Sequence, residues 1–220
     1  MILAIRTSSG RHGVGLLDDR AQVIASREAQ GTSLRGDSVA DLFAAVLKET
    51  GAERGQISSV LVDLGPGGLS STRAGISFAN AFAFGRAIEL KGVCSLELQL
   101  VEARLQTQLP VLSMRPAPGR QALWALYQQG QPVAVGCDAP VEAIARQRAQ
   151  FDSFAVAGPL GRFALDDISL EGIALIDIDP PRIESFAQVA HRAARMQDGL
   201  ALLEPINAPA GLIEGGPRDA

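Results

Sequence analysis

The turn from Gly65 to Gly68 joins an apolar strand to a helix-like run and has the clearest capacity for chemistry in this sequence. Backbone N–H groups at the start of a helix can hold an anion, so Gly65 and Gly67 are candidate anion-site residues, together with Arg73 in the helix. A Walker loop requires Lys and then Ser or Thr after its last glycine, and a dinucleotide loop requires G-x-G-x-x-G. Neither pattern is present here. A tight turn without a ligand is the alternative interpretation, because Gly and Pro are above all turn residues.

Arg6, Thr7 and Ser8 stand at the end of the first expected strand. ATP-using proteins of the actin-like group need an Asp there, because a carboxylate orients the hydrated magnesium that bridges the phosphates. A guanidinium cannot coordinate a cation, so we predict neither a metal nor magnesium-dependent phosphoryl transfer at this end of the sheet. These three residues are candidate anion contacts instead. Alternatively, Arg6 pairs with an acidic neighbour such as Asp63.

Histidine and cysteine are too sparse for several common active sites. His12 and His191 are far apart in sequence, so a zinc hydrolase and a Ser-His-Asp hydrolase are poorly supported, and we predict no catalytic residue. Each histidine is interpreted as a surface or capping residue. Cys94 and Cys137 form no Cys-x-x-Cys pair, and we expect both to be buried small hydrophobes.

Composition and charge narrow the function classes further. Lys plus Arg number 20 against 24 Asp plus Glu, so 20 − 24 gives a net charge of −4. This balance lacks the basic excess that phosphate backbones select, and direct nucleic-acid binding is not expected. No stretch approaches the roughly 20 apolar residues of a membrane span, and the first apolar run is too short for a signal peptide. We therefore expect a cytoplasmic protein without membrane association.

Hydrophobic periodicity predicts an antiparallel opening followed by alternating helices and strands in the first half of the chain. The first helix begins after Asp37 and ends at Gly51, which occupies the usual position of a C-terminal cap. The expected elements are strands at 2–6, 13–18 and 21–28, a helix from 38 to 51, a strand at 57–64, a helix at 70–86 and a strand at 92–95. This order favours an α/β fold of the ribonuclease H-like type, with mixed sheets flanked by helices, as in actin, sugar kinases and Hsp70.

A second, smaller α/β unit is expected after a connecting helix. The expected elements are that helix at 96–108, three strands between 109 and 138, a helix at 139–150, strands at 153–157 and 173–179, and a helix at 182–199. We therefore predict a first lobe at 1–100, a second lobe at 101–204 and a loosely held tail at 205–220, which is rich in Pro and Gly.

Two helices carry more apolar surface than a single core contact requires. The helix at 70–86 is apolar nearly all round, and such a helix must be buried on more than one side, in its own domain or against a partner. The candidate partner-interface residues are Val39, Phe43 and Val46 of the first helix and Ala74, Gly75, Phe78 and Phe82 of the second. Ordinary burial in the core is the alternative for both faces.

The motifs ILAIRTSS, GPGGLSSTRAG and GVCSL resemble the TsaB (YeaZ) family over about the first 95 residues. That family usually reads ILAIDTS and GPGSFTGVRIG, so this chain keeps Thr7, Ser8, Gly65, Gly67 and Arg73 but replaces the acidic position with Arg6. Later segments match less closely, and Ser113 stands where the family has the Asp of Asp-Ala-Arg. A diverged paralogue of the family is the alternative to a member that has kept its role.

The resemblance implies a two-lobed actin-like fold and a subunit without catalysis or cofactor of its own. Its implied partner is a TsaD-like subunit that carries ATP and a metal and modifies tRNA adenosine with threonylcarbamoyl. A TsaE-like ATPase joins the assembly, and a homodimer is a further possibility. The competing hypothesis is a small actin-like ATP-dependent phosphotransferase that uses Thr7, Ser8 and the Gly65 loop around Asp63. A protease is a weaker alternative, against which the shortage of histidine argues.

Overall fold

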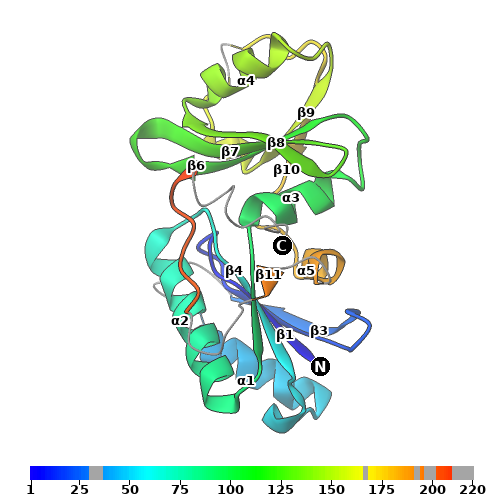
Figure 1. Ribbon diagram of the computed structural model, residues 1–220, viewed down its shortest axis with the longest axis vertical. Helices are drawn as coiled ribbons and strands as arrows, with labels where there is room; N and C mark the ends of the chain where they lie inside the picture. The colour runs from blue at the N-terminus through cyan, green and yellow to red at the C-terminus, as the bar shows by residue number, and fades with distance from the viewer. Residues whose placement is uncertain (30–36, 166–167, 191–193, 196–201, 210–220) are drawn as a thin grey trace. The chain divides into compact units, whose positions relative to one another are not determined.

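The structure is a computed structural model that describes residues 1–29, 37–165, 168–190, 194–195 and 202–209. The chain divides into two compact units (Figure 1). The first unit comprises Met1–Ser95 with Arg182–Ile206, and the second comprises Leu96–Pro181 with Asn207–Ala220. The two-lobed mixed α/β architecture predicted from the sequence is confirmed.

A six-stranded mixed sheet forms the centre of the first unit, in the order β11-β5-β4-β1-β2-β3. Its strands are β1 (Ile2–Arg6), β2 (Gly13–Leu17), β3 (Val23–Glu28), β4 (Ser59–Asp63), β5 (Glu89–Val93) and β11 (Ala194–Arg195). β1 pairs antiparallel with β2 and parallel with β4, so the opening hairpins and the later strand join one sheet. Residues of β1, β2 and β4 are almost all buried, as expected for central strands with apolar runs.

Helices α1 (Val39–Thr50) and α2 (Leu69–Arg86) pack on this sheet. The N-cap of α1 is Ser38, not the expected Asp37, because the Ser38 hydroxyl accepts the Asp41 N–H while the Asp41 carboxylate accepts the Ser38 N–H. This reciprocal capping box satisfies two backbone donors that the first turn leaves open. Gly51 caps the other end in the left-handed region at φ 68°, as predicted.

The chain returns to the first unit near its end, which corrects two predictions. Within the described residues, the helix expected at 182–199 is α5 (Glu184–Val189), and 194–195 form β11, which pairs antiparallel with β5, Ala194 opposite Gly92. Residues 182–206 therefore belong to the first unit instead of the second lobe, because an edge strand of the first sheet is completed by them. Residues 191–193 and 196–199 of that expected helix, and 210–220 of the tail expected at 205–220, lie outside the described residues.

The second unit is built on a five-stranded sheet in the order β10-β9-β6-β7-β8. Its elements are α3 (Ser95–Ala103), β6 (Val111–Ala117), β7 (Gln121–Gln128), β8 (Gln131–Asp138), α4 (Pro140–Arg148), β9 (Phe154–Gly158) and β10 (Ile173–Asp177). One face of the sheet carries Trp124 and Phe154 in an apolar core that α4 closes with Ile144. Three short 3-10 turns complete the fold: η1 (Arg54–Gln56), η2 (Pro118–Arg120) and η3 (Leu160–Arg162).

Within the described residues neither Cys94 nor Cys137 forms a disulfide, and both are only half buried, which corrects the expectation that they are buried. Cys137 lies on β8, an edge strand, and edge positions lack one neighbouring strand to cover them.

No helix among the described residues is long and apolar enough to cross a membrane.

Candidate functional site

Asp63 lies at the end of β4, fully buried, and three protein groups donate hydrogen bonds to its carboxylate. The Ser8 hydroxyl donates to one oxygen, and the Ser95 hydroxyl donates to the other at 2.5 Å. The Gly65 N–H donates to that second oxygen at 2.9 Å. The hydroxyl oxygens of Ser8 and Ser95 are themselves 2.8 Å apart. The carboxylate therefore links the ends of β1 and β4, the glycine turn and Ser95, all within the first unit.

This arrangement leaves Asp63 little capacity to bind a ligand. An ionised carboxylate offers about four lone-pair sites, and three are directed at neighbouring donors. A magnesium ion would need those oxygens in an open, partly hydrated site. Within the described part of the chain, no three His, Cys, Asp or Glu side chains are grouped as metal ligands would be.

Arg6 forms a buried ion pair with Glu28 across an intervening strand. The Arg6 side chain is 0% exposed, and its Nη2 lies 2.8 Å from the Glu28 carboxylate. Arg6 is opposite Gly13 on β2, and Gly13 is opposite Glu28 on β3, so the three residues form one row across the sheet. A Cβ on residue 13 would lie 2.9 Å from Arg6 Nη2, so the absence of a side chain there lets the guanidinium reach Glu28.

The prediction that Arg6 pairs with an acidic neighbour is confirmed, and the residue in its ion pair is Glu28, whereas Asp63 was the example named from the sequence. Asp63 is engaged by hydroxyl and N–H donors, and the acidic residue beside the guanidinium is Glu28. Arg6 lies on β1, which has β4 with Asp63 on one side and β2 on the other. Its guanidinium reaches Glu28 because Gly13 on β2 has no side chain in between. Because Arg6 is fully buried in this pair, its guanidinium is directed to the protein's own carboxylate.

The glycine turn is packed directly onto the segment after β1. The Gly68 N–H donates to the Ser8 carbonyl at 2.8 Å, and a Cβ on Gly67 would lie only 2.1 Å from that oxygen. The N–H of Gly65 is used by Asp63. Of the other anion-site candidates, Ser8 is buried in the Asp63 network, whereas Arg73 is exposed on α2.

Thr7 marks the place where α2 approaches β1 most closely. Its side chain is buried, its hydroxyl has no hydrogen-bond partner among the described residues, and a Cβ on Gly75 would lie 2.3 Å from that oxygen. Gly75 is thus required by close packing within the unit, although it was predicted as an interface residue. The contact fixes the position of α2 over the sheet.

The predicted interface residues fall into three groups. Val39, Phe43 and Val46 are in the core of the first unit, so burial within the domain accounts for them. Phe78 and Phe82 are half buried and pack edge-on against Phe43, with ring centroids 5.9 and 5.3 Å away. Ala74 is exposed.

An exposed line on α2, which we call the α2 crest, consists of Ala74, Ser77, Ala81 and Phe84. Phe84 is 71% exposed, and the sequence interpretation did not select it. Its spacing from Ala81 and Ser77 at three and four residues was the available signal, because these positions share one helix face.

His12 is buried, which corrects its interpretation as a surface or capping residue. Burial lowers the pKa of His12 below its ordinary 6.5, and the charge of Arg6 acts in the same direction, against a smaller opposing effect of the Asp37 backbone. His191 lies outside the described residues.

The second unit has a polar network on the face that α4 covers. Trp124 Nε1 donates to Asp138 at 2.8 Å, and Arg146 holds the same carboxylate with two N–H groups at 3.1 Å. These donors, the indole first, hold the pKa of Asp138 below its usual 3.8. The Arg146 guanidinium also lies 5.6 Å from the centre of the Trp124 ring. We interpret the network as structural.

The chain has a two-lobed mixed α/β fold like that of actin, sugar kinases and Hsp70, and the ends of its strands β1 and β4 carry the Arg6–Glu28 pair and the hydrogen-bonded Asp63. The family model described as TsaD, tRNA N6-adenosine threonylcarbamoyltransferase, matches residues 36–176, more than half of the chain. The chain belongs to this family. A tRNA N6-adenosine threonylcarbamoyltransferase from Geobacter sp. (strain M21) is 25% identical in an alignment 153 residues long that covers 62% of this chain. The match spans only 45% of that protein.

Solved structures confirm the fold and the resemblance to YeaZ predicted from the sequence. YeaZ from Pseudomonas aeruginosa superposes with a TM-score of 0.70 at 19% identity, over 93% of this chain and 98% of that one. A second structure, an uncharacterized protein with similarity to peptidase YEAZ from the same organism, gives the same score and identity over 97% of its length. The activator of 2-hydroxyisocaproyl-CoA dehydratase from Clostridium difficile, solved with bound ADPNP, has a TM-score of 0.50 at 10% identity.

Proposed function

We propose that this chain is a non-catalytic scaffold subunit that binds and organises a TsaD-like catalytic subunit for threonylcarbamoyl modification of tRNA adenosine. The observation that carries the proposal is the buried Arg6–Glu28 pair beside the hydrogen-bonded Asp63. An actin-like ATPase needs a carboxylate at the first position and an accessible metal site. This chain uses both places for internal contacts, so the ATP and metal of the reaction belong to the partner.

The α2 crest is the surface that we assign to the partner. Ala74, Ser77 and Ala81 have short side chains, which allow a second helix to approach closely, and Phe84 supplies an exposed aromatic anchor. Phe78 and Phe82 border the crest on the side of α1. A TsaE-like ATPase would then join the complex in the cytoplasm, and a homodimer through the same crest would form without the partner.

The alternative, an ATP-dependent phosphotransferase, has less support. It would require Asp63 to release the hydroxyls of Ser8 and Ser95 in order to hold magnesium. Isothermal titration of the chain with ATP and magnesium separates the two proposals. Tight, magnesium-dependent binding by the chain alone would contradict the scaffold assignment.

The direct test is to mix the purified chain with the TsaD-like subunit of its own source and to measure mass by light scattering during size exclusion. We expect a one-to-one complex. Ala81→Glu places a charge on the crest and should weaken binding at least about 30-fold, because an unpaired charge buried at an interface costs about 2 kcal/mol or more. The matched control is Ala145→Glu, the same change at an exposed position of α4, which should bind normally. Equal binding by both variants would count against the crest.

A further inference from the structure

A cavity of about 470 Å³, which we call the Arg104 pocket, lies within the second unit. It is lined by the segment that follows α3 and by the turn between β7 and β8. Pockets that hold small molecules typically have volumes of roughly 300–1,000 Å³, so this cavity is large enough for one. The lining residues are Arg104, Gln108, Pro110, Gln128, Gln129 and Gly130. None of them belongs to the α2 crest or contacts Asp63, so the pocket is distinct from both.

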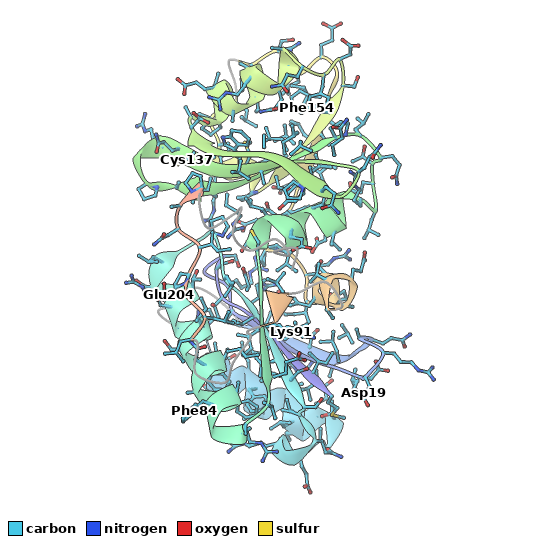
Figure 2. All side chains as sticks on the ribbon, in the orientation of Figure 1. Asp19, Phe84, Lys91, Cys137, Phe154 and Glu204 are labelled. Atoms are coloured by element: carbon cyan, nitrogen blue, oxygen red, sulfur yellow. The ribbon has the colours of Figure 1, made fainter. Side chains whose placement is uncertain are left out.

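Backbone contacts hold both sides of the Arg104 pocket in place. Gln129 and Gly130 are the two residues between β7 and β8, and both have left-handed φ angles, 51° and 83°. This conformation is typical of the tight two-residue turn that joins antiparallel strands. On the other side, the Pro110 carbonyl accepts the Ala155 N–H at 2.8 Å. Ala155 follows Phe154, which Figure 2 labels in the second unit. The pocket is therefore preformed in the folded chain.

Arg104 is the charged residue of the lining, and part of its guanidinium is unused. Its Nη1 donates to the Leu109 carbonyl at 3.1 Å, which fixes the side chain against the loop before β6. Its Nη2 is buried and has no hydrogen-bond partner among the described residues. An unpaired charged donor that is shielded from water is unfavourable. An acceptor that enters the pocket would relieve this cost, because rotation of the long side chain can turn Nη2 toward it.

We propose that the Arg104 pocket binds a small carboxylic acid through the Arg104 guanidinium. The planar guanidinium matches a carboxylate, because two parallel N–H groups can donate to its two oxygens. A single cation suits a single negative charge better than a phosphate group, which carries about −1.5 to −2 at pH 7. The exposed amides of Gln108, Gln128 and Gln129 each offer a donor and an acceptor, so they suit hydroxyl or amide groups on the same acid.

The test titrates the full ¹⁵N-labelled chain with small acids and follows the amide signals of Gln128, Gln129 and Gly130 by NMR. The probes are acetate, lactate, benzoate and N-acetylglycine, each paired with the neutral amide of the same shape. We expect at least one acid to shift these signals saturably, with a Kd below about 10 mM. Its neutral amide should bind at least about 10-fold more weakly, because the charge-assisted hydrogen bonds to Arg104 are lost.

Substitutions of arginine supply the second comparison. Arg104→Gln removes the charge and should weaken binding of the same acid at least about 10-fold. Arg104→Lys keeps the charge but not the planar fork, so its affinity should be intermediate. The matched control is Arg120→Gln, at an exposed position beyond the other end of β7, which should change affinity less than about twofold because an exposed, distant charge is screened. The amide spectrum of each variant shows whether it is folded.

Three results would overturn the assignment of the Arg104 pocket. They are the absence of saturable shifts with every acid, equal binding of an acid and its neutral amide, and unchanged binding by a folded Arg104→Gln variant. The pairs of acid and amide are measured on the unaltered chain, so they decide the matter even if that variant does not fold. The titrations contain no TsaD-like subunit, and their outcome is therefore independent of the proposed function.

Discussion

Removing the Glu28 carboxylate would take away the 2.8 Å ion pair of the buried Arg6 guanidinium. We expect Glu28→Ala to lower the free energy of unfolding strongly, even though Glu28 itself is 37% exposed. The reason is that the cost comes from Arg6, whose side chain is 0% exposed and cannot regain bulk water in the folded state.

The magnitude follows from the distance and the burial. At 2.8 Å the Coulomb attraction is about 6 kcal/mol for an effective dielectric constant of about 20. Desolvation of the guanidinium cancels part of this attraction, and removal of one partner from a buried pair typically costs about 3–5 kcal/mol. Because solvent reaches Glu28 and the Arg11 carbonyl accepts a weaker bond from Arg6 at 3.4 Å, we expect about 3 kcal/mol, the lower end of that range.

The reverse deletion should be milder. Arg6→Met fills similar space without a charge, and the half-exposed Glu28 can then be hydrated, so we expect a loss of about 1 kcal/mol. The double variant Arg6→Met with Glu28→Ala should be more stable than Glu28→Ala alone, because no buried charge is left. Urea denaturation of the four proteins at pH 7, followed by circular dichroism, provides the cycle.

Two results would refute this reasoning. The first is a loss below about 1 kcal/mol for Glu28→Ala, which is the size expected of an exposed ion pair. The second is strict additivity of the two substitutions, since residues in direct contact should show a coupling energy.

Three further predictions concern packing and pH. Gly75→Ala should destabilise the fold by about 2 kcal/mol in thermal or urea unfolding, because its Cβ would lie 2.3 Å from Thr7 Oγ1. The control is Gly85→Ala, whose Cβ meets nothing within 4 Å and which should stabilise the fold by about 0.5–1 kcal/mol. Since burial lowers the pKa of His12, the unfolded chain binds the proton more readily, so urea midpoints should fall as pH drops below 6.5, and His12→Gln should flatten that dependence. Asp138→Asn should lose stability at pH 7 but little at pH 3, because the lowered pKa of Asp138 adds stability only above the acid range, and equal losses at both pH values would contradict this.

Periodicity was sufficient for the elements whose signals are local. The short apolar runs of β1 and β2 and the helical spacing of α1 are properties of the side chains within each element, so their approximate positions were predictable. The capping box of α1 was also visible as Ser38 and Asp41 three residues apart, yet the acidic residue before them was preferred.

Contacts between distant segments were not predictable in this way. Arg6 had two acidic candidates, and only the register through Gly13 selects Glu28. The short strand β11 pairs with β5, and the backbone of Leu203 pairs with the Asn80 amide. Both pairings use backbone groups of the later segment, which leave no pattern in its side chains. The burial of His12 likewise depends on the neighbours that the fold brings to it.

The residues singled out for chemistry have a common structural effect, which is to position α2. Ser8 accepts the Gly68 N–H, Asp63 holds Gly65, and Thr7 packs against Gly75, so each contact links the end of a central strand to the turn or the body of that helix. A ligand-binding loop would need these groups to be available, whereas a helix that presents a fixed surface needs them occupied. The contacts that occupy Ser8, Asp63 and Gly68 are therefore the same contacts that hold α2 in place, and the scaffold role that we propose depends on that helix.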